Sequence, residues 1–158
     1  MTNYVLTFLI SMVPLVELRG GVPFGIIKGI PWQQALPLCM FANMIPVPFI
    51  FFFARKILVW GADKKYIGKF FSFCLEKGTH GGEKLQAKAG RGIYIALLLF
   101  VGIPLPGTGA WTGTLAASML DLDFKKSVIS VVLGVLLAGI IMTVLSLTGV
   151  AAFTAAAN

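Results

Sequence analysis

The sequence predicts an all-α membrane protein that crosses the bilayer more than once, and three observations lead to that prediction. Hydrophobic residues make up 58% of the 158 residues and charged residues 12%, well below the share of about 25% that soluble domains carry. Two uncharged runs are long enough to cross a bilayer, and a short apolar run broken by Pro and Gly precedes each of them. Most of the 13 Lys and Arg gather in one segment between the two halves. A soluble chain of this length has too little interior to bury so much apolar surface, so lipid is the expected solvent.

Residues 4–54 are predicted to form the first half. The apolar run Tyr4–Val16 is shorter than the about 20 residues that a crossing helix needs, and a break rich in Gly and Pro, ELRGGVPFGIIKGIP, follows it. Gln34–Phe53 has no charge and is long enough to cross. Asn43 and the two prolines that follow it predict that this span bends near its later half.

Residues 55–91 carry most of the positive charge and are expected to join the halves in the cytoplasm, because basic loops stay on that side of a membrane. Within them Ile67, Phe70, Phe71 and Cys74 recur at helical spacing between lysines. That pattern is typical of an amphipathic helix on a membrane surface, and it equally fits a helix packed on the body of the protein.

Residues 92–150 repeat the features of the first half, within one membrane domain that covers residues 1–158. A short apolar run, Gly92–Ile103, leads into the break GIPLPGTGAWTG, and Ser127–Thr148 is a plain span. The matched anchors are glycines of the two breaks and the residues that open the two spans: Gly21 and Gly25 with Gly109 and Gly113, and Trp32–Ala35 with Phe124–Ser127. A gap of a few residues is needed between these anchors, so the order of features is what repeats.

The breaks predict that each short helix pair is a re-entrant hairpin, which enters the bilayer and leaves by the same side. The helices are interrupted by Pro14, Pro23, Pro104 and Pro106. Irregular backbone is tolerated at membrane depth only inside protein or beside water. One crossing between the hairpins inverts the second relative to the first, which gives the inverted repeat of many transporters. The alternative is four ordinary kinked spans, which would place Glu17 and Arg19 deep in lipid at a cost of roughly 2.5–3.5 kcal/mol each.

Glu17 and Arg19 are the acid and the base of the first break, and they are the leading candidates for a functional site. Ionisable side chains inside a membrane segment are functional candidates by default. The Arg19 guanidinium offers a planar fork of donors for phosphate or carboxylate, and a desolvated Glu17 could exchange a proton during transport. The alternative is a structural ion pair that locks the hairpin turn.

Glycines mark the other candidate substrate-binding positions, Gly20, Gly21, Gly107 and Gly109. They precede short runs that are expected to be helical, and the free N–H groups and partial positive charge of a helix start suit an anion. Two such starts that point inward from opposite sides would form an anion cradle, although the same glycines would also let helices pack closely. Thr108 and Trp111 could line this cradle, or instead cap a helix and fill the core.

No pattern in the sequence predicts catalysis, a cofactor or a metal ion. The sequence has no nucleophile–base pair, metal-ligand spacing, phosphate-binding loop or dinucleotide fingerprint. The basic segment is short and joins apolar spans, so a nucleic-acid surface is not expected either. An enzyme is therefore disfavoured, and transport would be passive or driven by an ion gradient.

Two motifs, PLVELRGGVPFGI and GIPLPGTGAWTG, give the chain a resemblance to the family named putative small multidrug export proteins. The resemblance covers nearly the whole chain and implies efflux. The family is in turn distantly similar to the DedA (VTT-domain) membrane proteins, which include undecaprenyl phosphate translocases with two opposed re-entrant hairpins. On that likeness Glu17 and Arg19 match the charged first hairpin, whereas Ile103–Gly113 lacks the arginine that DedA proteins carry in the second.

Three hypotheses for the function follow. The first is a transporter of the cell inner (plasma) membrane that moves an anionic amphiphile, such as a polyprenyl (undecaprenyl) phosphate lipid, through a midplane site, with proton coupling through Glu17 as an option. The second is proton-coupled efflux of small cationic drugs, with Glu17 as the shared site for proton and drug. The third is a membrane scaffold that transports nothing. Membrane lipids and an amphiphilic or small-molecule substrate are the expected partners, and a homodimer is expected because four membrane segments make a thin wall around a polar site.

Overall fold

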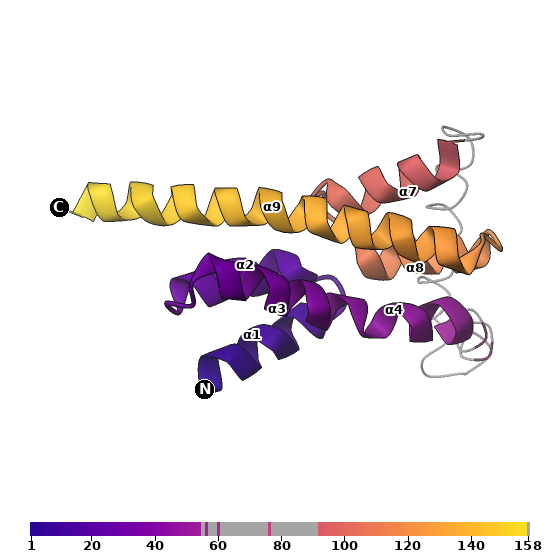
Figure 1. Ribbon diagram of the computed structural model, residues 1–158, viewed down its shortest axis with the longest axis horizontal. Coiled ribbons are helices and arrows are strands. Elements are labelled where there is room, and N and C mark those ends of the chain that lie inside the picture. The colour runs from indigo at the N-terminus through magenta and orange to yellow at the C-terminus, as the bar shows by residue number, and fades with distance from the viewer. Residues whose placement is uncertain (55, 57–59, 61–75, 77–91, 158) are drawn as a thin grey trace.

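The computed structural model describes residues 1–54, 56, 60, 76 and 92–157, and regular structure within them is helical throughout. The segment 55–91, for which the sequence predicts a basic amphipathic helix, lies outside the described residues apart from those isolated positions. Figure 1 shows the helices on either side of this segment as two groups that lie along one long axis.

The first group begins with α1 (Thr2–Met12) and α2 (Glu17–Ile27). α1 ends before Pro14, as expected. Pro23, however, lies inside α2 and does not interrupt it, so the prediction of a break there is wrong. A proline within a helix removes one backbone hydrogen bond, and α2 tolerates the loss because α1, α3 and α9 pack around it.

The second group begins with α7 (Ile93–Gly102) and α8 (Ala110–Met119). The break between them contains two prolines and two glycines with positive φ, 79° at Gly107 and 142° at Gly109. Glycine adopts such angles without the clash that a Cβ causes. α8 therefore starts directly after Gly109, where the sequence predicts a helix start.

α2 and α8 end in the same turn. Each closes with a Schellman motif, in which Gly29 and Asp121 take the left-handed position, with φ of 83° and 51°. The bonds that close the two turns are Ile30 N–H to Gly25 O at 2.9 Å and Leu122 N–H to Ala117 O at 3.0 Å. Asp is among the residues that tolerate this conformation best after Gly, so one turn can use either residue.

The long helices begin at the same spacing after these turns, at Trp32 and Phe124. These are the two positions that the predicted repeat aligns. When α2 and α8 are aligned by the turns that end them, Gly21 coincides with Gly113 and no gap is needed. The sequence pairing of Gly21 with Gly109 is therefore wrong. The sequence pairing was shifted by one helical turn, because glycine spacing alone does not fix where a helix starts.

Each short helix pair returns to the end of the molecule from which it starts (Figure 1). In the first pair, the Asn3 amide of α1 donates to the carbonyl of Lys28, which follows α2, at 3.4 Å. In the second pair, the backbone N–H of Asp123, which follows α8, donates to the hydroxyl of Tyr94 in α7 at 3.2 Å. The two pairs occupy opposite ends of the long axis (Figure 1).

Among the described residues, two helical stretches are long and apolar enough to cross a membrane, Trp32–Phe53 and Phe124–Ala152. The first consists of α3 (Trp32–Met44), α4 (Pro46–Phe49) and a π-helix, η1 (Ile50–Ala54). Its interruption at Ile45 confirms the bend predicted from the prolines. The second lies in α9 (Phe124–Ala157). Both begin earlier than the predicted spans Gln34–Phe53 and Ser127–Thr148, since the turn residues before them already fix the helix start.

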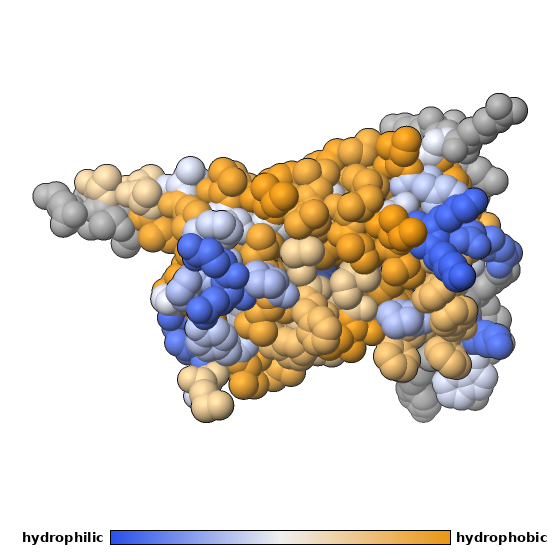
Figure 2. All heavy atoms as spheres, viewed as in Figure 1, coloured by the Kyte–Doolittle hydropathy of each residue, from blue (hydrophilic) through white to orange (hydrophobic). Residues whose placement is uncertain are grey.

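Each group packs onto the long helix of the other. α2 contacts α9, and α8 contacts α4 and η1. Fully buried side chains come from both groups: Leu18, Val22, Leu97, Val101, Val131 and Val135. Large apolar side chains also cover the outside, and Figure 2 shows a hydrophobic surface between hydrophilic patches at the two ends of the long axis. This is the surface expected of a chain whose middle is solvated by lipid.

Candidate functional site

Glu17 stands at the start of α2, and its carboxylate binds the start of α8. Oε1 accepts a hydrogen bond from the backbone N–H of Trp111 at 2.9 Å, and Oε2 accepts one from the N–H of Ala110 at 3.1 Å. The first amides of a helix lack partners within the helix and form the positive end of its dipole. Glu17, only 4% exposed, is therefore the cap of a helix in the opposite group.

The backbone of Glu17 is itself unusual. Its φ is 53°, a left-handed conformation that costs a non-glycine residue roughly 1–2 kcal/mol. The two bonds to α8 are made by a charged acceptor in a buried place, where a hydrogen bond contributes about 1.5–3 kcal/mol. The contact with α8 thus offsets the strain that places this carboxylate.

Arg19, two residues later, binds the other half of the same break. Its Nη1 donates to the carbonyl of Leu105 at 2.6 Å, and its Nη2 donates to the carbonyls of Val101 and Ile103, both at 3.3 Å, and to the hydroxyl of Thr108 at 2.8 Å. Val101 and Ile103 end α7, where the last carbonyls have no partner within the helix. Arg19 therefore caps α7 at its negative end.

The acid and the base of α2 are thus divided between the two ends of one helix break. The carboxylate meets the positive start of α8 and the guanidinium meets the negative end of α7, which is the favourable arrangement for both dipoles. Among the described residues, Glu17 and Arg19 form no ion pair with each other, so the structure does not contain the predicted pair that locks the first turn. The second break is what these charges hold.

Gly109 is the residue that lets the carboxylate approach. A Cβ at this position would lie 2.4 Å from Oε2 of Glu17 and 2.7 Å from Oε1. Its backbone, with φ of 142° and ψ of −174°, also lies in a region that is essentially restricted to glycine. Close approach and backbone conformation both require the missing side chain here.

Comparison with known proteins identifies the family of the chain. The family model described as "Putative small multi-drug export protein" matches residues 17–141, from Glu17 through both breaks and into α9. The chain belongs to this family. Its name and the apolar helices indicate a membrane protein of an export family, consistent with a transporter. Neither the curated proteins nor the solved structures that were compared give a match.

Several buried polar side chains near Glu17 have no hydrogen-bond partner among the described residues. Asn43 of α3, 0% exposed, faces the Glu17 carboxylate without the geometry of a hydrogen bond, and both ends of its amide are unpaired. The hydroxyl of Thr114, 1% exposed, and Nε1 of Trp111 are also unpaired among the described residues. Each such group costs about 1–3 kcal/mol when it is left without a partner, so its presence needs a reason.

The remaining predicted site residues take different places around this contact. Thr108 accepts from Arg19 and lies within hydrogen-bond distance of the Leu105 carbonyl, 2.8 Å, so it closes the turn of the break. Gly107 is exposed on the same turn. Gly20 and Gly21 lie inside α2, which begins at Glu17, so the prediction that they precede a helix is wrong.

The glycine faces are used for packing within this member of the export family. A Cβ at Gly21 would lie 1.9 Å from the Ser11 hydroxyl, and one at Gly113 would lie 2.6 Å from Val101. These contacts are the close helix packing that the sequence analysis gave as the alternative. The same faces are therefore not free to form contacts between subunits. The homodimer stays a prediction.

Sequence reasoning missed the partners of the two charges. Glu17 binds backbone amides and Arg19 binds mostly backbone carbonyls, and the sequence carries no direct sign of either. The sequence also gave no prediction for Thr114 and Ser118. Their spacing of four residues on one helix face, between apolar positions, was the available signal.

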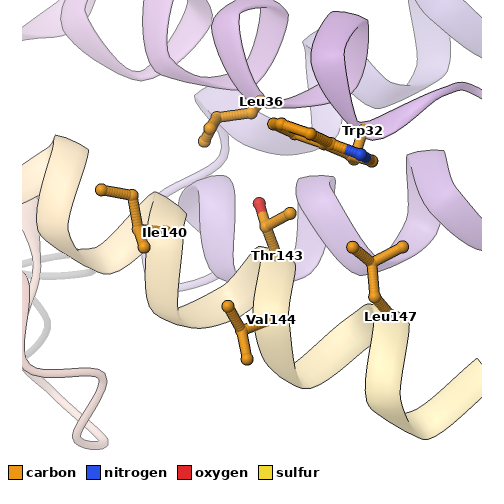
Figure 3. Close-up of a pocket in the computed structure, with 6 residues that line it drawn as sticks. All are labelled: Trp32, Leu36, Ile140, Thr143, Val144 and Leu147. Carbon is orange, nitrogen blue, oxygen red and sulfur yellow. The ribbon is translucent and has the colours of Figure 1, made fainter.

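A shallow groove of about 250 Å³ lies away from this site, between α3 and α9. It is lined by Trp32, Leu36, Ile140, Thr143, Val144 and Leu147 (Figure 3). The Thr143 hydroxyl donates to the Gly139 carbonyl at 2.8 Å, so the groove offers no free polar group from this side chain. Within the described part of the chain, no three His, Cys, Asp or Glu side chains lie close enough together to hold a metal ion.

Proposed function

We propose that the protein is a proton-coupled membrane transporter of anionic amphiphiles, with Glu17 as the group that carries the proton. One observation carries the proposal: a buried carboxylate occupies the start of α8, which is a place built for an oxyanion. Protonation would remove the charge of Glu17 and weaken its hold on α8. The amides of Ala110 and Trp111 would then be open to the anionic group of a substrate.

The membrane arrangement in this proposal is the inverted repeat of two re-entrant hairpins, α1–α2 and α7–α8, each followed by a crossing helix. Three findings support it: the helix pairs return to their own ends of the molecule, they occupy opposite ends, and their helices are too short to cross. A helix of 11 residues such as α1 is about 16 Å long, half of the about 30 Å hydrocarbon core. Glu17 would therefore lie near the midplane.

The surroundings of Arg19 favour an amphiphile over a fully polar substrate. Arg19 is half-buried, and the side chains of two residues whose carbonyls it binds, Ile103 and Leu105, are 43% and 55% exposed. The polar site thus borders a surface that lipid would cover. A molecule with an anionic head and an apolar tail could reach the site from within the bilayer.

Transport by reconstituted protein tests the proposal. In liposomes with an imposed pH gradient, we expect the wild-type protein to move fluorescently labelled farnesyl phosphate, and Glu17→Gln to lose the dependence on the gradient. The substituted amide would keep one acceptor oxygen for the α8 N–H groups but could not take up a proton. Asp123→Asn is the matched control, because Asp123 also caps a helix by accepting from Lys126 N–H at 3.0 Å, but is exposed at one end.

A second candidate is proton-coupled efflux of small cationic drugs, and two observations favour it. Glu17 is the buried acid of the described residues, and the family name refers to multidrug export. In the same liposomes, transport of ethidium but not of the phosphate probe would replace the first candidate with the second. If neither probe moves and both Glu17 and Arg19 tolerate neutral substitution, the scaffold hypothesis takes the place of transport.

The cellular setting is part of the proposal. We place the chain in the inner (plasma) membrane, with segment 55–91 in the cytoplasm because of its positive charge. The end of the molecule that holds η1 and the start of α9 would then face the cytoplasm, and Lys28 would face the opposite side. Membrane lipids would be direct partners of the exposed apolar surface.

A further inference from the structure

Two of the unpaired side chains, Asn43 and Thr114, belong to the two sides of one seam between α8 and the broken span α3–α4–η1. Two contacts fix the register of this seam. At one end Asn43 faces Glu17, which binds the Ala110 amide; at the other end the Ser118 hydroxyl donates to the Phe51 carbonyl at 2.6 Å. The spacing from Asn43 to Phe51 equals the spacing from Ala110 to Ser118. The two segments are therefore parallel and in register.

Thr114 lies midway along this seam. It is on the same face of α8 as Ala110 and Ser118, and all three residues are buried. The register places it level with Val47 on the opposing segment, next to the interruption at Ile45. Its hydroxyl has no partner among the described residues, although a helical Thr usually bonds to the carbonyl one turn earlier.

The opposing segment is irregular at the same level. Pro46 and Pro48 have no N–H to offer to the carbonyls of Ala42 and Met44. The π-helix η1, which follows directly, is a rare form that occurs frequently at functional sites. The irregular stretch of the opposing segment thus lies level with Thr114, between Asn43 and η1.

The mixture of these groups identifies the ligand class. Nδ2 of Asn43 is a donor, Oδ1 of Asn43 is an acceptor, and the Thr114 hydroxyl is both. Donors that point into a site disfavour a metal cation. Water satisfies donors and acceptors together, and a buried water typically makes about three hydrogen bonds to groups of this kind.

We propose that the seam between α8 and α3–α4–η1 binds water and forms the proton path between Glu17 and the η1 end of the molecule. This inference rests on the proposed function, because it supplies the route for the proton that Glu17 carries. The step moves only a proton: hydronium at the seam gives it to an oxygen of Glu17 and becomes water. Arg19 is the charged side chain that acts on Glu17 there, and its guanidinium is bound to the end of α7 and the turn that follows it.

Thr114→Val tests the path because it removes the hydroxyl and keeps the shape of the side chain. We expect proton-driven transport of the farnesyl phosphate probe to fall about tenfold, the factor that one lost hydrogen bond of ordinary strength gives, with unchanged binding of the probe. Thr143→Val is the matched control, since Thr143 is also buried but its hydroxyl is paired within α9. Melting temperatures of both variants show whether the fold is intact.

X-ray footprinting gives a readout that does not depend on transport. Hydroxyl radicals form from bound water and label the side chains beside it, so Trp111 should be labelled quickly in the wild-type protein and more slowly in Thr114→Val. The inference is overturned if Trp111 stays unlabelled, or if a wild type that transports through Glu17 is unaffected by Thr114→Val. A wild type that labels but does not transport contradicts the proposed function and leaves the water site standing.

Discussion

Gly109 and Glu17 are two residues whose roles depend on each other. The Glu17 carboxylate reaches the α8 amides only because no side chain stands at Gly109, where a Cβ would lie 2.4 Å from Oε2. Gly107, two residues earlier, also has a positive φ, but a Cβ there would meet no atom within 4 Å. A side chain at Gly107 would strain only the backbone, whereas a side chain at Gly109 would strain the backbone and also displace the Glu17 carboxylate.

Replacing each glycine by alanine measures that difference. We expect Gly107→Ala to lower the free energy of unfolding by about 1 kcal/mol, the cost of a left-handed alanine. Gly109→Ala should lower it by about 3 kcal/mol or more, because strain in a glycine-only region adds to the clash with Glu17. Melting temperatures in detergent compare the two, with Gly149→Ala as a reference for alanine at an open position inside a helix, where no loss of stability is expected. Equal losses for Gly107→Ala and Gly109→Ala would show that Glu17 does not approach as closely as described.

At the scale of elements, one side chain ties the end of α7 to the turn that follows it. Arg19 does so with bonds to three carbonyls and one hydroxyl, which requires the planar fork of a guanidinium. Lysine keeps the charge near the helix end but cannot reach acceptors in several directions at once. We therefore expect Arg19→Lys to lose about 2 kcal/mol of stability, the contribution of a hydrogen bond to a charged group.

Thermal unfolding of Arg19→Lys and Arg19→Ala separates these contributions. If charge at the end of α7 is what matters, the lysine variant will melt with the wild type and only the alanine variant will be destabilised. If the fork matters, as the geometry indicates, the two variants will melt at similar temperatures. Lys28→Ala serves as a control, because Lys28 is an exposed cation at the end of α2, away from the second break.

The elements also show which parts of the fold can be read from the sequence. The breaks after Met12 and Gly102 follow from prolines, and the interruption at Ile45 follows from Pro46, because each effect is local to the chain. Pro23 shows the limit: it has the same chemistry, yet neighbouring helices hold α2 together around it. The pairing of Glu17 with Ala110 and Trp111 was beyond sequence reasoning, since every residue but proline carries the same backbone N–H.

At the scale of the whole molecule, the decisive property is on which side of the membrane each helix pair begins and ends. Asn3 and Lys28 are joined by a hydrogen bond at one end of the molecule, whereas Tyr94 and Asp123 are joined in the same way in the second pair. A chain with four ordinary spans would carry Asn3 and Lys28 to opposite sides. The two arrangements therefore differ in a quantity that labelling can measure directly.

Single cysteines placed in a chain without Cys39 and Cys74 decide between them. We expect a membrane-impermeant maleimide to label Asn3→Cys and Lys28→Cys from the outer face of the membrane only. Gly92→Cys and Lys126→Cys should be labelled from the cytoplasmic face only, because they flank the basic segment and the start of α9. Vesicles of known orientation provide both faces for each variant. If Asn3→Cys and Lys28→Cys react from opposite faces, α1 and α2 together cross the bilayer. Glu17 would then not lie at the turn of a re-entrant hairpin, and the proposed proton path from Glu17 toward η1 would be contradicted.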